Sequence, residues 1–166
     1  GLVGENGAGK TTLIRLLTGL NFKSEGEIIL FGHKDNLQHE RSKIGCTIEM
    51  PALYKDMTAS QNLEVQRIQR GIPNKKCITD TLELIGLSNA GKKRVANFSL
   101  GMKQRLALGV ALLGEPEFLI LDEPVNGLDP TGIIELRELL KKLVKEREVT
   151  ILISVSYTHL RAHETS

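Results

Sequence analysis

Hydrophobic residues along this chain follow two kinds of pattern that alternate with each other. Short runs of mostly apolar residues occur at 27–31, 44–48, 118–121 and 149–153. Such runs are typical of strands, and fully apolar ones are typical of buried strands in a parallel sheet. Longer segments between them repeat leucine and isoleucine every three or four positions, which predicts helices with one apolar face.

The helical periodicity predicts five helices, and Ser99 is expected to cap the N-terminus of the fourth. The expected helices cover residues 11–20, 58–70, 78–87, 99–113 and 131–145. Strands that alternate with helices predict an α/β fold with a parallel sheet core. The mostly helical stretch from about 56 to 113 is interpreted as an inserted α-helical subdomain.

Composition narrows the classes of function only slightly. The 166 residues suffice for one domain with a core, and the net charge of +2 gives no reason to expect nucleic acid as a partner. Cys46 and Cys77 lie far apart and are expected to be free thiols. No apolar run approaches the roughly 20 residues of a membrane-spanning helix, so we expect any action at a membrane to need a partner.

A glycine-rich segment near the start carries the first candidate chemistry, because it fits the phosphate-loop pattern G-x-x-x-x-G-K-[ST]. Its glycines let several backbone N–H groups point at phosphate oxygens, and the following helix adds its positive N-terminus. Lys10 is expected to reach the β- and γ-phosphates, and Thr11 to offer its hydroxyl to Mg²⁺. The alternative is an ordinary glycine-rich turn before a helix. The candidate ATP-binding residues are Gly4, Glu5, Asn6, Gly7, Ala8, Gly9, Lys10, Thr11 and Thr12.

Two carboxylates, Asp122 and Glu123, end the apolar run at 118–121. In sheets of this kind phosphates bind at the carboxyl ends of the strands. Asp122 is therefore a candidate for holding Mg²⁺, and Glu123 is the candidate catalytic residue that polarises the attacking water. The alternative is a pair of solvated charges. Together with the phosphate loop, the pair predicts a P-loop NTPase.

Residues 98–105, Phe-Ser-Leu-Gly-Met-Lys-Gln-Arg, resemble the signature of ABC ATP-binding domains, which usually reads L-S-G-G-Q-[KR]-Q-R. Leu100 and Met102 depart from that pattern. The resemblance implies that Ser99 and the Gly101 amide bind the γ-phosphate of an ATP held by an opposing domain. Without its neighbouring motifs, the stretch would read equally well as a capped helix with solvated charges.

Two further segments resemble parts of the same family. Residues 124–130 resemble the D-loop, which implies that Asp129 contacts the opposing phosphate loop; Asp129 can also cap the helix that follows. Residues 44–51 stand where the family has its Q-loop, with Glu49 at the position of the usual glutamine. A carboxylate there could ligate or position Mg²⁺, and the alternative is a solvated strand end.

The resemblance covers about residues 1–154 and is closest to exporter ATPases of bacitracin-resistance and lantibiotic-immunity systems. Its subgroup pattern is Ile-Glu-Met-Pro-Ala-Leu-Tyr at 48–54, followed by Met-Thr-Ala-Ser-Gln-Asn-Leu at 57–63. It implies an ATP-binding and ATP-hydrolysing subunit of an exporter of peptide antibiotics or drugs, with ATP and Mg²⁺ as cofactors. The implied partners are a transmembrane permease and a second ATP-binding domain, not nucleic acid. The implied location is cytoplasmic, peripheral on the inner face of the cell membrane.

Three other functions have sequence requirements of their own. A soluble ABC-type ATPase acting on DNA would carry a long heptad-rich insertion, and one acting on ribosomes would carry two cassettes. A GTPase would need N-K-x-D, but residues 74–77 read Asn-Lys-Lys-Cys. A regulatory module that binds ATP without hydrolysing it would not need a catalytic carboxylate, so Glu123 argues against this function.

Both ends of the sequence depart from the family pattern. The chain opens directly on the phosphate loop, so we expect an N-terminal truncation that removes nearly all of the first strand and the aromatic residue that stacks on adenine. After Ser154 the family continues Ser-Ser-His or Ser-His, whereas residues 155–166 resume no family pattern and are expected to be a non-native tail. His159 and His163 are assigned no function, although a shifted switch histidine is the alternative. The chain as written is expected to turn over ATP inefficiently.

Overall fold

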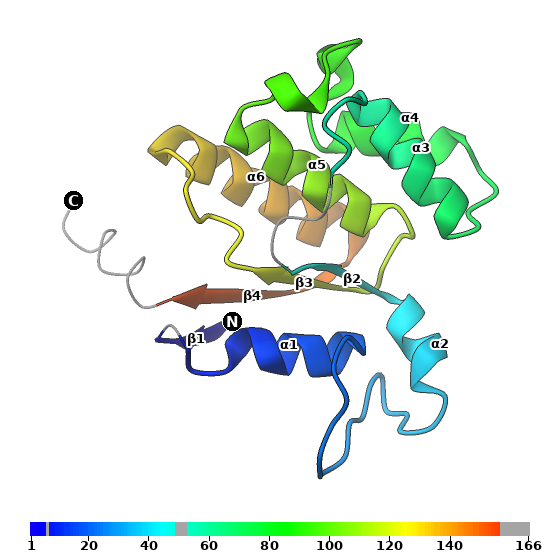
Figure 1. Ribbon diagram of the computed structural model, residues 1–166, viewed down its shortest axis with the longest axis vertical. Helices are drawn as coiled ribbons and strands as arrows, with labels where there is room; N and C mark the ends of the chain where they lie inside the picture. The colour runs from blue at the N-terminus through cyan, green and yellow to red at the C-terminus, as the bar shows by residue number, and fades with distance from the viewer. Residues whose placement is uncertain (6, 49–52, 157–166) are drawn as a thin grey trace.

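Four parallel strands form the single sheet of the computed structural model, which describes residues 1–5, 7–48 and 53–156. The strands lie in the order β1-β4-β3-β2 (Figure 1). Parallel pairing between strands separated by helices is the α/β fold that the alternating pattern predicts. The strands are β1 Leu2–Gly4, β2 Ile44–Thr47, β3 Phe118–Asp122 and β4 Thr150–Ser156.

The register of this sheet brings the C-terminal ends of the strands to one edge. Asp122 at the end of β3 lies opposite Ser154 of β4, and Gly4 at the end of β1 lies opposite Ser156. The loops that follow the strands therefore all begin close together at this edge. Ligands of open α/β sheets bind at such an edge.

Helices cover both faces of the sheet (Figure 1). Helix α1 lies on one face, and α5 and α6 lie on the other, with α3 and α4 packed on α5. The five predicted helices are present with ends shifted by a few residues, and α2 was not predicted. The helices are α1 Lys10–Thr18, α2 Leu37–Ser42, α3 Ala59–Gln69, α4 Lys76–Leu84, α5 Leu100–Leu112 and α6 Pro130–Arg147, with short 3₁₀ turns at Ser88–Ala90 and Val95–Asn97.

Side-chain caps fix where three of these helices begin. Thr58 and Gln61 form a reciprocal capping box at the start of α3. Ser99 accepts the Met102 N–H at the start of α5, which confirms the predicted N-cap. Asp129 caps α6 in the same way, which agrees with the alternative prediction that Asp129 is the N-cap of this helix.

The hydrophobic core lies mainly between the sheet and α5 and α6. Leu119 and Leu121 of β3 belong to this cluster, together with buried residues of α3, α4, α5 and α6. Side chains alternate along a strand, so Ile120 faces the opposite side, where α1 packs on β3 with the fully buried Ile14.

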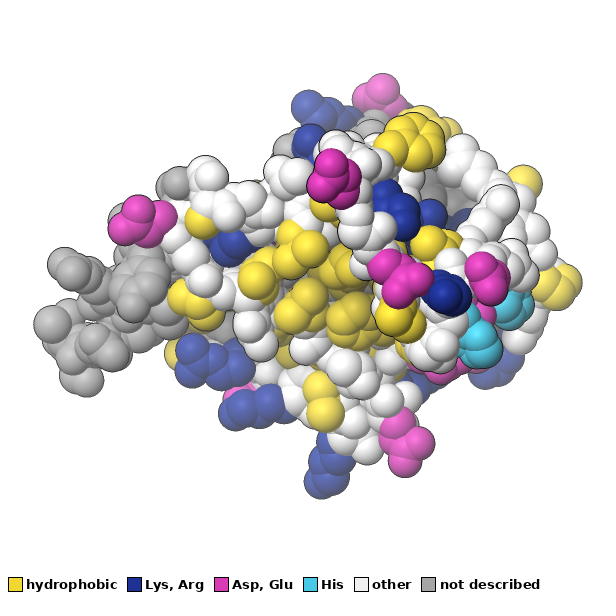
Figure 2. Space-filling model, turned by 90° about the horizontal axis from the view of Figure 1, so that it is seen from below, with side chains coloured by type: hydrophobic (Ala, Val, Ile, Leu, Met, Phe, Trp, Pro, Cys, Tyr) yellow, Lys and Arg dark blue, Asp and Glu magenta, His cyan; other side chains and the backbone are white. Residues whose placement is uncertain are grey.

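The outer surface of α1 is less buried than its leucine pattern suggests. Leu13 in α1 is exposed, and so is Leu20, two residues after the helix ends. Hydrophobic side chains gather at the centre of the face seen from below (Figure 2), and Ile29 and Phe31, in the segment after α1, are also exposed. The leucines at helical spacing in the segment of α1 therefore do not form a single buried face.

The prediction of a strand at 27–31 is wrong. Only Leu30 pairs, with His33 in an isolated bridge. Phe31 and Gly32 between them both have positive φ, 50° and 81°, and so form a tight reversal. The four-stranded sheet does not reach this segment, which leaves the rest of the apolar run without a neighbouring strand to pair with.

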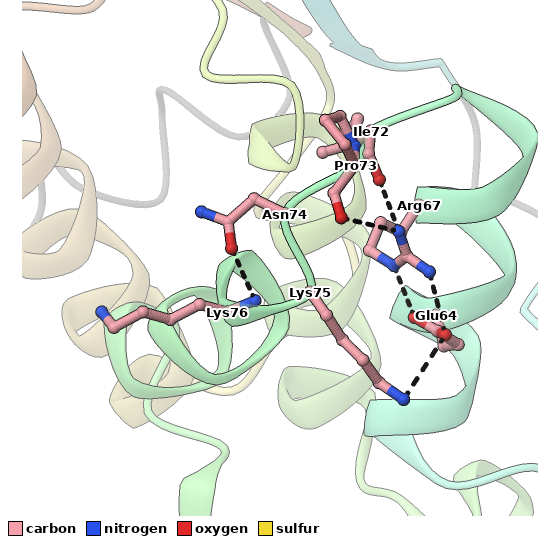
Figure 3. A network of polar contacts seen from close by, with 7 residues as sticks. All are labelled: Glu64, Arg67, Ile72, Pro73, Asn74, Lys75 and Lys76. Carbon is pink, nitrogen blue, oxygen red and sulfur yellow. Dashed lines mark hydrogen bonds and ion pairs between the residues drawn. The ribbon is translucent and has the colours of Figure 1, made fainter.

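A polar network holds the connection between α3 and α4 (Figure 3). Arg67 binds both carboxylate oxygens of Glu64 and also donates to the carbonyl oxygens of Ile72 and Pro73. The hydrogen bond from Arg67 holds the pKa of Glu64 below its ordinary value. The loop after α3 is thereby tied to the helix that precedes it.

Residues 53–117 are mostly helical where the structure describes regular elements, apart from an isolated bridge between Thr58 and Arg94. Most of their buried hydrophobic residues belong to the same hydrophobic cluster as the sheet. A separate subdomain at 56–113 stays a prediction. Among the described residues, no helix combines the length and the apolar character that crossing a membrane requires.

Gly45 in β2 offers a test of this packing. A Cβ atom there would lie 2.4 Å from the Ala111 carbonyl oxygen of α5, whereas a Cβ at Gly114 would meet nothing within 4 Å. We expect Gly45→Ala to lower the free energy of unfolding by about 1–3 kcal/mol, the usual cost of overpacking. Gly114→Ala is the matched control and should be near neutral. Equal melting temperatures of the two variants by circular dichroism would contradict this packing.

Candidate functional site

The loop between β1 and α1 has the backbone that the phosphate-loop pattern predicts. Gly7 and Gly9 have φ of 81° and 86°, a region that residues with a side chain rarely adopt. Gly9 is the N-cap of α1 and supplies no side-chain hydrogen bond, and the first turn of α1 contains no acidic residue. The N–H groups at this helix end are therefore available to an anion.

Lys10 folds back into this loop. Its Nζ donates to the carbonyl oxygens of Gly4 at 2.8 Å and Glu5 at 2.9 Å. The ammonium group and the helix N-terminus therefore lie beside each other at the same loop. Positive charge and free N–H donors at one place favour a phosphate group.

Thr11 and Asp122 join the loop to the acidic strand end. The Thr11 hydroxyl donates to Asp122 Oδ2 at 2.8 Å across 111 positions of sequence. The other carboxylate oxygen, Oδ1, is buried and has no hydrogen-bond partner among the described residues. A hydroxyl and a carboxylate oxygen side by side fit the oxygen ligands of Mg²⁺, which usually takes one or two protein groups and completes its shell with phosphate and water.

Glu123 leaves the strand in a strained conformation. Its φ is 49°, and its N–H donates to the Ser154 carbonyl oxygen at 3.0 Å. A non-glycine residue in this region costs free energy and is common at functional sites. The Ser156 hydroxyl donates to Glu123 Oε2 at 3.4 Å, so β4 orients both the backbone and the carboxylate.

Asp122 and Glu123 line a cavity of about 300 Å³ together with Thr11. The first turns of α5 close its other side. The sequence did not single out Thr47, Gln104 or Asn126 for this cavity, although Thr47 ends an apolar strand as Asp122 does. The complete lining is Thr11, Thr47, Leu100, Gln104, Asp122, Glu123 and Asn126.

Several residues of the two segments that resemble the signature and the D-loop line a second hollow, of about 540 Å³. Ser99, Gly101 and Asp129 all line it. The Ser99 oxygen accepts the Met102 N–H at 3.2 Å, which leaves its hydroxyl proton free to donate to a ligand. The predicted site residues are thus divided between two hollows, and Leu100 lines both of them.

Asn6 and Glu49 lie outside the described residues, so their roles stay predictions. Thr12 follows Thr11 in α1, and its side chain is exposed.

Both cysteines are free, as predicted. Cys46 lies one position before Thr47, and burial raises the pKa of its thiol. A thiol with a raised pKa is mostly protonated near neutral pH and is therefore a poor nucleophile.

Comparison with known proteins gives a consistent picture. The family model described as ABC transporter matches residues 1–126. The bacitracin transport ATP-binding protein BcrA of Bacillus licheniformis is 49% identical over 156 residues, which is 93% of this chain and 51% of that protein. The lantibiotic transport ATP-binding protein SrtF of Streptococcus pyogenes is 46% identical over 153 residues, 92% of this chain and 66% of that protein.

Solved structures show the same fold. CbiO1 of Clostridium perfringens, part of the ABC transporter complex cbiONQ, matches with a TM-score of 0.79 and 28% identity, over 93% of this chain and 66% of that chain. A dimeric ATP-binding cassette in a post-hydrolysis state, bound to ADP and Pi, matches with a TM-score of 0.77 and 26% identity, over 94% of this chain and 73% of that chain. The chain spans about half the length of the bacitracin relatives.

Lys10 provides the direct test of the phosphate loop. Lys10→Ala removes a charge-assisted hydrogen-bond donor at the loop, so we expect ATP affinity to fall roughly 10- to 100-fold. Lys142→Ala, at an exposed lysine of α6, is the matched control and should bind as the wild type does. Isothermal titration with ATP measures both, and unchanged affinity of Lys10→Ala would disprove the assignment.

Proposed function

The chain belongs to the ABC transporter family, and we propose that it binds and hydrolyses ATP as the ATP-binding subunit of an exporter. One observation carries the proposal. The hydrogen bond from Thr11 to Asp122 joins a phosphate loop to an acidic strand end, with Glu123 as the next residue. That arrangement has the parts needed to hold a nucleoside triphosphate and to direct water at it.

We infer that the triphosphate lies along the loop and the N-terminus of α1. The Lys10 ammonium would exchange its two carbonyl partners for phosphate oxygens. Thr11 and Asp122 would hold Mg²⁺, which when bound neutralises charge on the phosphates. The Thr11 proton can still reach Asp122 while its oxygen faces the metal, because a hydroxyl has one donor and two acceptor sites.

Glu123 is proposed as the group that takes a proton from the attacking water. Glu123 lines the same cavity as Thr11, which supports a role beside the proposed phosphate site. The family pattern Ser-Ser-His, begun at Ser154, would put its switch histidine at position 156. Ser156 contacts Glu123 from that position, but a serine hydroxyl cannot carry the positive charge of a histidine.

A second ATP-binding domain is proposed as the partner that completes each site. Ser99, Gly101 and Asp129 line a hollow of their own, apart from the Lys10 loop. Two copies arranged head to tail would bring the signature hollow of each against the loop of the other, and such a pair is closed by two-fold symmetry. The dimeric ATP-binding cassette bound to ADP and Pi supports the formation of a dimer.

The exported substrate is proposed to be a peptide antibiotic or a drug, by analogy with the bacitracin and lantibiotic relatives. A transmembrane permease would supply the pathway, and the domain would lie on the cytoplasmic face of the membrane. A soluble ABC-type ATPase acting on ribosomes or DNA is the alternative. A neighbouring coding sequence with about six apolar segments of spanning length separates the two, since only a transporter needs it.

The role of Glu123 can be tested by Glu123→Gln in a full-length protein that contains this domain. The amide keeps the shape of the side chain but cannot accept the proton, so we expect hydrolysis to slow by roughly 10²–10⁴-fold while ATP binding is retained. The variant should also accumulate as an ATP-bound dimer in analytical ultracentrifugation. Turnover at the wild-type rate would exclude Glu123 as the base.

Ser99 tests whether the signature acts across a dimer. Ser99→Ala should abolish most hydrolysis, whereas Thr58→Ala, which removes a comparable N-cap from α3, should not. A mixture of Ser99→Ala and Lys10→Ala subunits should regain one working site per mixed dimer. That site joins the intact loop of one subunit to the intact signature of the other. Failure of the mixture to exceed either variant alone would argue against action in trans.

A further inference from the structure

Ser154 is a buried polar group that the proposed mechanism leaves without a role. The residue is 0% exposed, and its hydroxyl has no hydrogen-bond partner among the residues that the structure describes. A hydroxyl that is removed from water and left unpaired costs free energy, so it usually has a partner or a function. Leu152, two positions earlier, points to the same face of β4, so this face also takes apolar side chains.

Asp122 lies directly across from Ser154 in the parallel register of β3 and β4. Residues opposite each other on neighbouring strands point to the same face, so both side chains point toward α1. The Asp122 carboxylate uses Oδ2 for Thr11, while its buried Oδ1 also lacks a partner in the described part of the chain. Two unpaired buried groups thus lie on adjacent strands at the same level.

The two groups are chemically complementary. A serine hydroxyl has a proton to donate, and an ionised carboxylate can only accept. Neighbouring strands lie about 4.8 Å apart, so rotation about the serine χ1 or one intervening water can join the two side chains. A hydrogen bond to a charged oxygen is stronger than one between neutral groups.

We propose that Ser154 is a positioning residue that hydrogen-bonds Asp122 Oδ1, directly or through one water, and so fixes the carboxylate that serves Mg²⁺. The inference rests on the proposed function. The backbone of Ser154 already performs a related task, because its carbonyl oxygen accepts the Glu123 N–H at 3.0 Å. One residue of β4 therefore anchors both acidic residues, Asp122 by its side chain and Glu123 by its main chain.

Groups that orient a metal-facing ligand have a measurable effect on the metal. Their removal typically weakens metal affinity or activity by 10- to 100-fold, although they do not touch the metal. A hydroxyl that served only to fill space would leave metal affinity unchanged when replaced by alanine. Metal affinity therefore separates a positioning role from a structural one.

The test uses the full 166-residue chain with Mn²⁺ as the probe and a non-hydrolysable ATP analogue, so it does not depend on turnover. Free Mn²⁺ is measured by electron paramagnetic resonance. We expect Ser154→Ala to weaken Mn²⁺ binding about 10-fold. Ser154→Thr keeps the hydroxyl and should bind nearly as the wild type does. If threonine does not fit at this buried position, Ser154→Cys, which has a weaker donor, should bind between wild type and alanine.

Ser42→Ala is the matched control, because that serine hydroxyl bonds the His39 carbonyl oxygen in α2 and should not affect Mn²⁺. Equal Mn²⁺ affinity of Ser154→Ala and wild type would overturn the inference. Equal weakening in the alanine and threonine variants would also overturn it, because shape rather than the hydroxyl would then matter. A wild-type chain that binds no Mn²⁺ with the analogue would overturn the proposed function as well, which distinguishes the two failures.

Discussion

The hydrogen bond between Thr11 and Asp122 is the contact on which the organisation of this molecule depends. It joins the first helix to the third strand and forms only if β1, β4 and β3 lie side by side in parallel. The order β1-β4-β3-β2 places Asp122 and the phosphate loop at the same sheet edge, with β4 between their two strands. The central position of β4 explains why its residues, Ser154 and Ser156, contact or neighbour both acidic residues.

The same constraint accounts for the strain at Glu123. The chain must turn sharply after β3 if a carboxylate is to face the cavity instead of continuing the strand. A φ of 49° accomplishes this turn, and the hydrogen bond to the Ser154 carbonyl oxygen holds it. Rigid support of this kind favours catalysis because the group needs no rearrangement when the substrate arrives.

Sequence alone predicted most of the fold and the glycine-rich turn of the candidate phosphate loop, for identifiable reasons. The fully apolar run at 118–121 and the glycine spacing at 4–11 are local signals, and each fixes a local structure. The segment at 27–31 failed because a strand needs a partner, and its hydrophobicity does not report whether one exists. The pairing of Asp122 with Ser154 and the contact of Ser156 with Glu123 depend on strand register, which no local pattern contains.

Leu100 stands in the wall between the two hollows, with one side toward the carboxylates and the other toward Ser99 and Asp129. It also packs against the turn at Gly127, where an added Cβ would lie 3.0 Å from its Cδ2. A substitution at Leu100 would therefore change the shape of both hollows. Any side chain that replaces Leu100 in the hollow of Ser99 and Asp129 also lines the cavity of Asp122 and Glu123. A substitution of Leu100 that adapted the chain to the proposed partner domain would therefore also change the wall of the candidate ATP site.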